Sequence, residues 1–199
     1  MLDKSIPFVG LFMKQPVGAP SAHFPLPDGF EFSFYRDGDE LSWAAIEASA
    51  LEFDSESDAL AYYKERFIPF AQELYSRCLF IEHEGEKVAT ATAWYNVVEG
   101  ERRAWLSWVA VKSEYQGRGL GKALVSRVTE LMMDLDGDVD FYLRTQTWSY
   151  VAIDIYKKHG FEPTNEKVLY TEGREYNYKK ALRILRRVEK RRQKRLKRS

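Results

Sequence analysis

The sequence predicts a mixed α/β fold in which helices pack as layers on a largely antiparallel sheet. Residues 78–83, 87–98 and 103–111 are consecutive β-rich runs separated by short Gly-containing turns, which is the pattern of antiparallel strands. A segment of helical periodicity at 120–135 then leads to a further β-rich run at 140–147. A helical crossover joins parallel strands, so we expect this last run to pair in parallel with 103–111.

The composition is that of one folded domain without disulfide or metal sites. The chain has 199 residues, of which 45% are hydrophobic and 30% charged, and these values exclude a disordered protein. No apolar run reaches the length of a bilayer span and the start lacks a cleavable leader pattern, so we expect a cytoplasmic protein that does not bind membranes. Cys78 is the only cysteine, and His23, His83 and His159 stand singly, which predicts surface or turn histidines rather than metal ligands.

The first elements are an arm, a strand and a helix. Residues 1–29 are rich in proline and contain two short apolar runs, so we expect an extended N-terminal arm that covers apolar surface of the domain. An alternating strand follows at 30–36. The turn Asp37-Gly38-Asp39 then begins a helix that runs to about Leu51.

Two further helical segments precede the first hairpin. Ser55, with Asp58 three residues later, forms a capping box for a second helix. Pro69 interrupts this helix, and a short third helical piece ends near Arg77.

Periodicity also defines the later part of the chain. The helix at 120–135 has its apolar residues on one face, namely Leu120, Leu124, Val128, Leu131 and Leu135. We expect another helix at 149–159, a short strand after Phe161 and a strand near 168–178.

The turn before the helix at 120–135 carries an anion-binding pattern, Gln116-Gly117-Arg118-Gly119-Leu120-Gly121. Glycines let the backbone approach a ligand closely, and the N–H groups at a helix start point toward anions. Arg118 and Lys122 add full positive charges. The spacing does not fit a P-loop, because Ala123 follows Gly121-Lys122, and it does not fit a dinucleotide fingerprint, whose third glycine would stand at Lys122.

As a Q-x-x-G-x-G pattern after a V-A-V strand, this turn resembles the acetyl-coenzyme A signature of the GCN5-related N-acetyltransferases. Residues 149–161, SYVAIDIYKKHGF, resemble the later helix of the same family, N-x-x-A-x-x-hydrophobic-Y-x-x-x-G-F, with Ser149 in place of Asn. The resemblance implies the acyl-CoA N-acyltransferase fold, an α+β fold with helices on both faces of the sheet and a splayed parallel strand pair. It divides the chain into the arm at 1–29, an N-acetyltransferase domain at 30–178 and a basic C-terminal helix or tail at 179–199.

The resemblance also implies a site for the acetyl donor, acetyl-CoA, between the splayed strands. Backbone groups of Val109, Ala110 and Val111 are expected to bind the pantetheine arm and the thioester, and Ser149 is a further coenzyme contact. The pyrophosphate is expected on Gln116, Gly117, Arg118, Gly119, Leu120, Gly121 and Lys122. Tyr156 matches the family position that places a phenol near the sulfur, so we expect it to be the general acid.

The sequence does not assign a general base. Many family members carry a glutamate on the strand before the glycine loop, but the inward positions there are Trp105 and Ser107. Glu52, Asp54 and Glu82 remain candidates, either directly or through a water molecule.

The charge of the chain is concentrated at its C-terminal end. Residues 179–199 contain 12 basic residues and one acidic residue, whereas the rest of the chain contains 18 basic and 29 acidic residues. A stripe at helical spacing, formed by Tyr178, Ala181, Ile184, Leu185 and Val188, predicts a helix that docks on the acidic body or joins two copies in a homodimer.

These observations lead to one function hypothesis and two alternatives. The hypothesis is an N-acetyltransferase that transfers an acetyl group from acetyl-CoA to a primary amine of a small-molecule or peptide acceptor, with Trp94 and Trp148 as candidates for the acceptor pocket. A nucleic-acid- or ribosome-associated protein is the alternative that the basic tail suggests, although the acidic body disfavours it. A coenzyme-binding sensor without turnover is the other alternative, because no base is evident.

Overall fold

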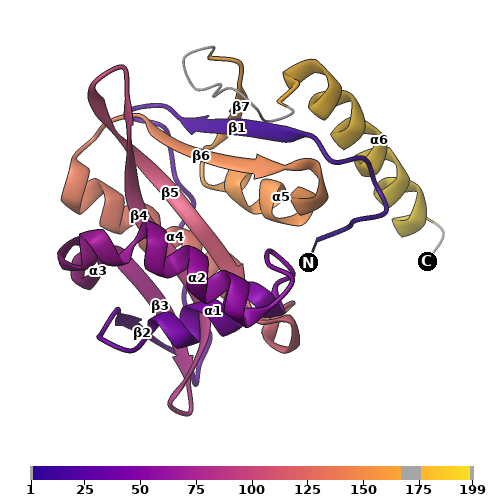
Figure 1. Ribbon diagram of the computed structural model, residues 1–199. Coiled ribbons are helices and arrows are strands. Elements are labelled where there is room, and N and C mark those ends of the chain that lie inside the picture. The colour runs from indigo at the N-terminus through magenta and orange to yellow at the C-terminus, as the bar shows by residue number, and fades with distance from the viewer. Residues whose placement is uncertain (1, 167–175, 198–199) are drawn as a thin grey trace.

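The computed structural model describes residues 2–166 and 176–197, which form helical layers on a seven-stranded mixed sheet (Figure 1). The strands lie in the order β2-β3-β4-β5-β6-β1-β7. Their bounds are β1 Gly10–Gln15, β2 Glu31–Phe34, β3 Cys78–His83, β4 Glu86–Val98, β5 Glu101–Val111, β6 Phe141–Gln146 and β7 Glu162–Thr164. Neighbouring strands are antiparallel except β5 and β6, which are parallel, so the predicted mixed sheet is confirmed.

Helices cover both faces of this sheet. Their bounds are α1 Glu40–Ser49, α2 Glu56–Arg66, α3 Ala71–Arg77, α4 Leu120–Asp136, α5 Tyr150–Lys158 and α6 Tyr178–Leu196, with single 3-10 turns at Ile68–Phe70, Ser113–Tyr115 and Thr147–Ser149. Helices α1, α2 and α3 pack on one face, and α4 and α5 pack on the other. The predicted helices on both faces are therefore present.

The alternation of side chains along the strands produces two cores. In β3, Leu79 and Ile81 are fully buried beneath α4, whereas Cys78 and Phe80 are fully buried beneath α1 and α2. Successive residues of a strand point to opposite faces, so one short strand contributes to both cores. Each core is thus a separate helix-on-sheet layer that shares the same strands.

The local helix signals are confirmed. Ser55 is the N-cap of α2, and its Oγ accepts a hydrogen bond from the backbone N–H of Asp58 at 3.1 Å. Helix α4 buries the predicted apolar residues Leu120, Leu124, Val128 and Leu131. Leu135, in its last turn, is 38% exposed, because the helix extends past the edge of the core.

The N-terminal segment differs from the expected arm at residues 10–15, which form strand β1 inside the sheet. Strand β1 lies between β6 and β7 and is antiparallel to both (Figure 1). Val9, Leu11 and Met13 are buried in the core beneath α4. The position between β6 and β7 is therefore filled from the N-terminal side of the chain.

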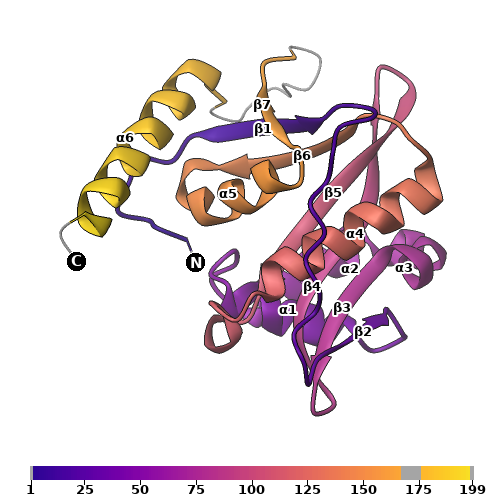
Figure 2. The same cartoon turned by 180° about the vertical axis from the view of Figure 1, so that it is seen from behind.

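The linker from β1 to β2, residues 16–30, crosses the outer face of α4 (Figure 2). The backbone N–H of Phe24 donates to Oγ of Ser126 on α4 at 2.9 Å. His159, which we expected at the surface or in a turn, lies in the turn after α5 and is fully buried under this crossing. Its ring nitrogens lie 3.0 Å from Ser126 Oγ and 2.9 Å from the Ile155 carbonyl oxygen. Burial lowers the pKa of this imidazole. Of the two predicted positions, the turn is confirmed and the surface is not.

The strand expected near 168–178 lies mostly outside the described residues. Within the described part, Tyr176 makes an isolated parallel bridge with Gly10, and Tyr178 begins helix α6. The predicted docking stripe is confirmed, since Ala181 and Val188 are buried against the domain. No helix in the described ranges has both the length and the apolar character of a membrane span.

Candidate active site

A long cleft opens where β5 and β6 separate. The parallel pairing of these strands consists of Trp105 with Tyr142 and Leu106 with Leu143. Beyond these pairs the strands diverge and leave a cleft of about 1710 Å³. Residues 107–111 of β5 and 144–146 of β6 line its two walls. The expected splayed parallel pair is therefore present, and its two strands form opposite walls of the site.

A β-bulge in β5 shapes one wall. Thr90 of β4 pairs with Ala110 and Thr92 pairs with Ser107, so two residues of β5 oppose one residue of β4. Within the bulge, Trp108 has a φ of 52°, a left-handed conformation that costs a non-glycine residue about 1–2 kcal/mol. Such strain persists only where the surrounding structure holds it.

The bulge also reverses the alternation of β5. Before it, Leu106 belongs to the core beneath α4; after it, Ala110 belongs to the core beneath α1. Ser107 and Trp108 consequently both line the cleft, with Trp108 stacked on the ring of Phe53, which lies in the loop between α1 and α2, at 5.4 Å between ring centroids. One extra residue thus places an indole beside the cleft.

The glycine loop and the first turn of α4 form one end of the cleft. Gly119 is the N-cap of α4 with a φ of 90°, and no side chain among the described residues caps this end of the helix. The first N–H groups of the helix therefore have no side-chain cap within the described part of the chain, and the residues that carry them, Leu120 and Gly121, line the cleft. A Cβ on Gly121 would lie 3.3 Å from Cδ1 of Ile155, so this glycine permits close packing of α4 and α5.

Two side chains of this loop have structural contacts. Gln116 donates from Nε2 to the carbonyl oxygen of Val111 at 2.9 Å, which ties the loop to the end of β5. Arg118 lies over the ring of Tyr115 and donates to the carbonyl oxygen of Glu114. Arg118 does not line the cleft. All the other predicted site residues do, namely Val109, Ala110, Val111, Gln116, Gly117, Gly119, Leu120, Gly121, Lys122, Ser149 and Tyr156.

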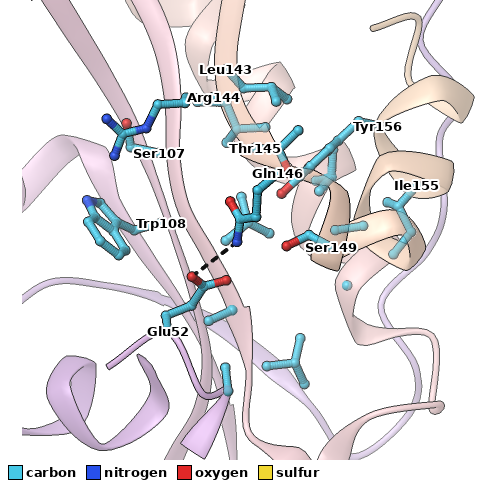
Figure 3. A pocket seen from close by; sticks show the side chains of 18 of the residues that line it. Glu52, Ser107, Trp108, Leu143, Arg144, Thr145, Gln146, Ser149, Ile155 and Tyr156 are labelled. Carbon is cyan, nitrogen blue, oxygen red and sulfur yellow. Dashed lines mark hydrogen bonds between the residues drawn. The ribbon is translucent and has the colours of Figure 1, made fainter. Parts of the chain in front are cut away.

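Ser149, the N-cap of α5, and Tyr156, within α5, face the cleft from the side opposite Trp108 (Figure 3). Both are largely buried, with exposed fractions of 8% and 7%. Burial, together with the neighbouring carboxyls of Glu52 and Glu47, raises the pKa of the Tyr156 phenol. The phenol is therefore protonated at neutral pH and can donate a hydrogen.

A strained turn at the end of α1 brings two carboxyl residues together. Leu51 has a φ of 66°, its N–H donates to the Ala48 carbonyl oxygen, and the N–H of Glu52 donates to the Glu47 carbonyl oxygen. This is the Schellman pattern, in which glycine usually occupies the left-handed position. The turn folds Glu52 back beside Glu47, and both side chains line the cleft.

The two carboxyl groups differ in their contacts. The Glu47 side chain is 1% exposed, and its Oε1 has no hydrogen-bond partner among the described residues. Glu52 faces the open cleft, where the amide of Gln146 donates to its Oε2 at 3.5 Å (Figure 3). Burial and mutual repulsion raise the pKa of Glu47 well above its ordinary value. Loss of solvation against the cleft wall also raises the pKa of Glu52, although the hydrogen bond from Gln146 and the nearby charges of Lys4 and Arg144 oppose this shift.

The remaining base candidates do not reach the cleft. Glu82 accepts hydrogen bonds from Ser33 and Lys87 on the β2–β3 edge, and these contacts lower its pKa. Asp54 is not among the residues that line the cleft, whereas Trp105 and Ser107 are. Of the three candidates from the sequence, Glu52 is the one at the site.

Aromatic side chains line the part of the cleft that faces α2 and β4. They are Tyr62, Phe67, Phe70, Trp94, Trp105 and Trp108. Trp94 is therefore where we expected it. Trp148 is not, because its Nε1 donates to the Ile6 carbonyl oxygen at 2.6 Å and its ring packs on Phe8. The expectation that Trp148 lines the cleft is wrong, since the indole anchors the N-terminal segment.

Sequence reasoning missed Glu47, Arg144 and Gln146. A signal for Glu47 was available, because it lies four residues after Trp43 and so on the same, buried face of α1. Arg144 and Gln146 had no such signal. Their positions at the end of β6 become informative only when the strand pairing is known.

Comparison with known proteins agrees with this geometry. Residues 40–161 match the family described as the acetyltransferase (GNAT) family. Thialysine N-epsilon-acetyltransferase of Sus scrofa is 34% identical over 65 residues, which are 33% of this chain and 38% of that protein. N-acetyltransferase 8B of Rattus norvegicus is 31% identical over 90 residues, 44% of this chain and 40% of that protein. The matches thus span less than half of each of these two relatives.

Solved structures show the same fold. A GCN5-related N-acetyltransferase from Sphaerobacter thermophilus superposes with a TM-score of 0.60 at 19% identity, over 78% of this chain and 48% of that one. A GNAT-family acetyltransferase from Colwellia psychrerythraea superposes with a TM-score of 0.59 at 13% identity, over 80% of this chain and 55% of that one. At this level of identity the likeness concerns the fold.

Proposed function

Because the chain belongs to the acetyltransferase (GNAT) family, we propose that it transfers the acetyl group of acetyl-CoA to a primary amine of a small molecule or peptide. The observation that carries the proposal is the continuous cleft from the glycine end of α4, between β5 and β6, to the carboxyl pair at the end of α1. Donor and acceptor can enter such a cleft from opposite ends and meet beside Tyr156.

The residues of the cleft fit the coenzyme. A pyrophosphate needs N–H donors, and the uncapped N-terminus of α4 offers them behind Gly119, where no Cβ stands in the way. An extended pantetheine arm needs backbone partners, and β5 and β6 stop pairing where residues 109–111 line the cleft. Lys122 lines the same end and adds a positive charge.

Acetyl-CoA supplies a thioester whose carbonyl carbon accepts a nucleophile. In our proposal, the backbone of Val109 to Val111 orients this group. The aromatic side chains that line the cleft near α2 and β4 exclude water from it. Tyr156 donates its phenolic proton to the departing sulfur, a role that its raised pKa supports, since the phenol stays protonated across the neutral range. Thiolates leave readily, so this donation assists the reaction and is not indispensable to it.

Two measurements test the proposed function. Calorimetric titration with acetyl-CoA and with acetate should give binding of the first and none of the second. Release of free thiol should then be followed with a panel of primary amines, which includes thialysine because the pig relative is named for that acceptor. Coenzyme binding without thiol release for any amine would favour the sensor alternative, and failure to bind acetyl-CoA would refute both readings.

A further inference from the structure

One oxygen of the buried Glu47 carboxyl lacks a hydrogen-bond partner among the described residues, and Glu47 borders the cleft. Its Oε1 is hydrogen-bonded to no described group, and the side chain lines the cleft although only 1% of it is exposed. A buried carboxyl without hydrogen-bond donors is costly, and most buried polar atoms in folded proteins are satisfied. A hydrogen-bond donor bound in the cleft beside Glu47 would offset this cost.

The second carboxyl makes the missing donor a cation. Glu52 is exposed at the cleft and lies beside the buried Glu47, whose pKa is raised by burial and by repulsion from Glu52. A bound positive charge relieves both the desolvation and the repulsion. A metal ion fits poorly, because the described residues contain no group of three or more histidine, cysteine, aspartate or glutamate side chains that could hold one.

The walls around the carboxyl pair indicate what carries the charge. Tyr62, Phe67, Trp94 and Trp108 line the adjoining part of the cleft. Aromatic faces attract organic cations and pack against flat or aliphatic bodies. The backbone strain supports a functional origin: Leu51 and Trp108 have positive φ values, whereas Glu84 and Glu99, the other such non-glycine residues described, lie in hairpin turns before glycines.

We propose that Glu47 and Glu52 form the acceptor subsite, which selects a small cationic primary amine with an apolar body. This inference rests on the proposed acetyl transfer. Glu52 is the general base of the reaction, and Glu47 is a positioning residue that holds the charge of the amine. The sequence offered Glu52 as one of three candidates, and Glu47 was not among them.

The proton balance of this step is as follows. Glu52 takes one proton from the ammonium group, and the freed amine attacks the acetyl carbonyl carbon to form the N–C bond. The C–S bond breaks, Tyr156 protonates the sulfur, and the phenol recovers a proton from the nitrogen. One ammonium ion and one thioester thus become one amide, one thiol and one proton, which Glu52 releases to solvent.

Binding is tested first, with three probes on the full chain saturated with coenzyme A. 2-Phenylethylamine carries the charge and an apolar body, 2-phenylethanol has the same body without the charge, and 3-phenylpropionate has the opposite charge. Calorimetry should detect binding of the amine and at least tenfold weaker binding of the other two. Equal binding of the amine and the alcohol, or no binding of the amine, would overturn the inference.

Three variants then separate the roles of the two acids. Glu52→Gln and Glu47→Gln keep shape and should each weaken amine binding about tenfold or more, with unchanged affinity for acetyl-CoA. In turnover, Glu52→Gln should lower kcat about 10²-fold and abolish the acid limb of its pH profile, whereas Glu47→Gln should mainly raise KM for the amine. Glu65→Gln, an exposed acid on α2, is the matched control and should resemble the wild type.

The outcomes distinguish this inference from the proposed function. Wild-type turnover of amines that persists unchanged in both cleft variants would refute the carboxyl subsite and leave acetyl transfer standing. Loss of acetyl-CoA affinity in either variant would assign the residue to the donor site and equally refute the inference. Absence of acetyl-CoA binding in the wild type would refute the proposed function itself.

Discussion

The backbone N–H of Glu52 donates a hydrogen bond to the carbonyl oxygen of Glu47 at 3.1 Å, and this bond closes the last turn of α1. It requires a left-handed Leu51, with a φ of 66°. The strained turn sets two acids side by side at the cleft, where burial and the neighbouring Glu52 make ionisation of Glu47 unfavourable. Functional sites often lower the stability of the folded protein, because the arrangement that function needs is not the most stable one.

The pH dependence of stability should reveal this cost. Below the ordinary pKa of 4.5, Glu47 is neutral in both the folded and the unfolded states. As the pH rises above 4.5, the unfolded state ionises first, so the wild type should lose stability up to the raised pKa of the folded state. Glu47→Gln removes this loss, by about 1.4 kcal/mol for each pH unit in that interval. Thermal unfolding of both proteins from pH 4 to 8 measures the difference, and parallel curves would contradict it.

Gly119 should be needed for coenzyme affinity. Gly119→Ala places a side chain at a φ of 90°, which costs about 1–2 kcal/mol and distorts the helix start that faces the cleft. The affinity for acetyl-CoA should fall about tenfold or more. Gly18→Ala is a matched control, because Gly18 also has a positive φ but lies in the linker with open space around it. Equal loss of affinity in both variants would show that strain, and not the site, is responsible.

The phenol of Tyr156 should matter for turnover rather than for binding. Tyr156→Phe removes one oxygen and keeps the ring, which packs against Phe161. We expect kcat to fall about 10²-fold, the lower end of general acid catalysis, with little change in acetyl-CoA affinity. Steady-state thiol release and a coenzyme titration check this together. Unchanged kcat would assign Tyr156 to packing, and a defect confined to binding would make it a coenzyme contact.

The end of α6 should be dispensable for acetyl transfer. Removal of residues 190–199 leaves the buried anchors Ala181 and Val188 in place and deletes the exposed ion pair between Arg192 and Asp154. Exposed pairs contribute little to stability, so turnover should stay within about twofold of the full chain. Retention on immobilised RNA at low salt is the companion measurement. Strong retention that the truncation abolishes would support the nucleic-acid alternative.

Signals that act over a few residues determined much of this protein from sequence alone. The Ser55 cap, the apolar stripe of α4 and the glycines before it each depend on neighbours within one or two turns, so they could be identified without the fold. The parallel pairing of β5 with β6 followed from the helix between them, because crossovers constrain topology. The positions of Tyr156 and of the glycine loop at one cleft followed from the family resemblance.

Only the tertiary structure decided where distant segments meet. Strand β1 enters the sheet between β6 and β7 because a gap there accepts an apolar strand, and nothing within residues 10–15 specifies that gap. The position of Trp148 was likewise not predictable from nearby residues. Its indole N–H donates to the carbonyl oxygen of Ile6, which is distant in sequence. Glu47, Glu52 and Gln146 meet across the cleft although β6 follows α1 by almost a hundred residues. Electrostatic interactions depend on the distance between charges in space, and this distance cannot be inferred from their separation in the sequence.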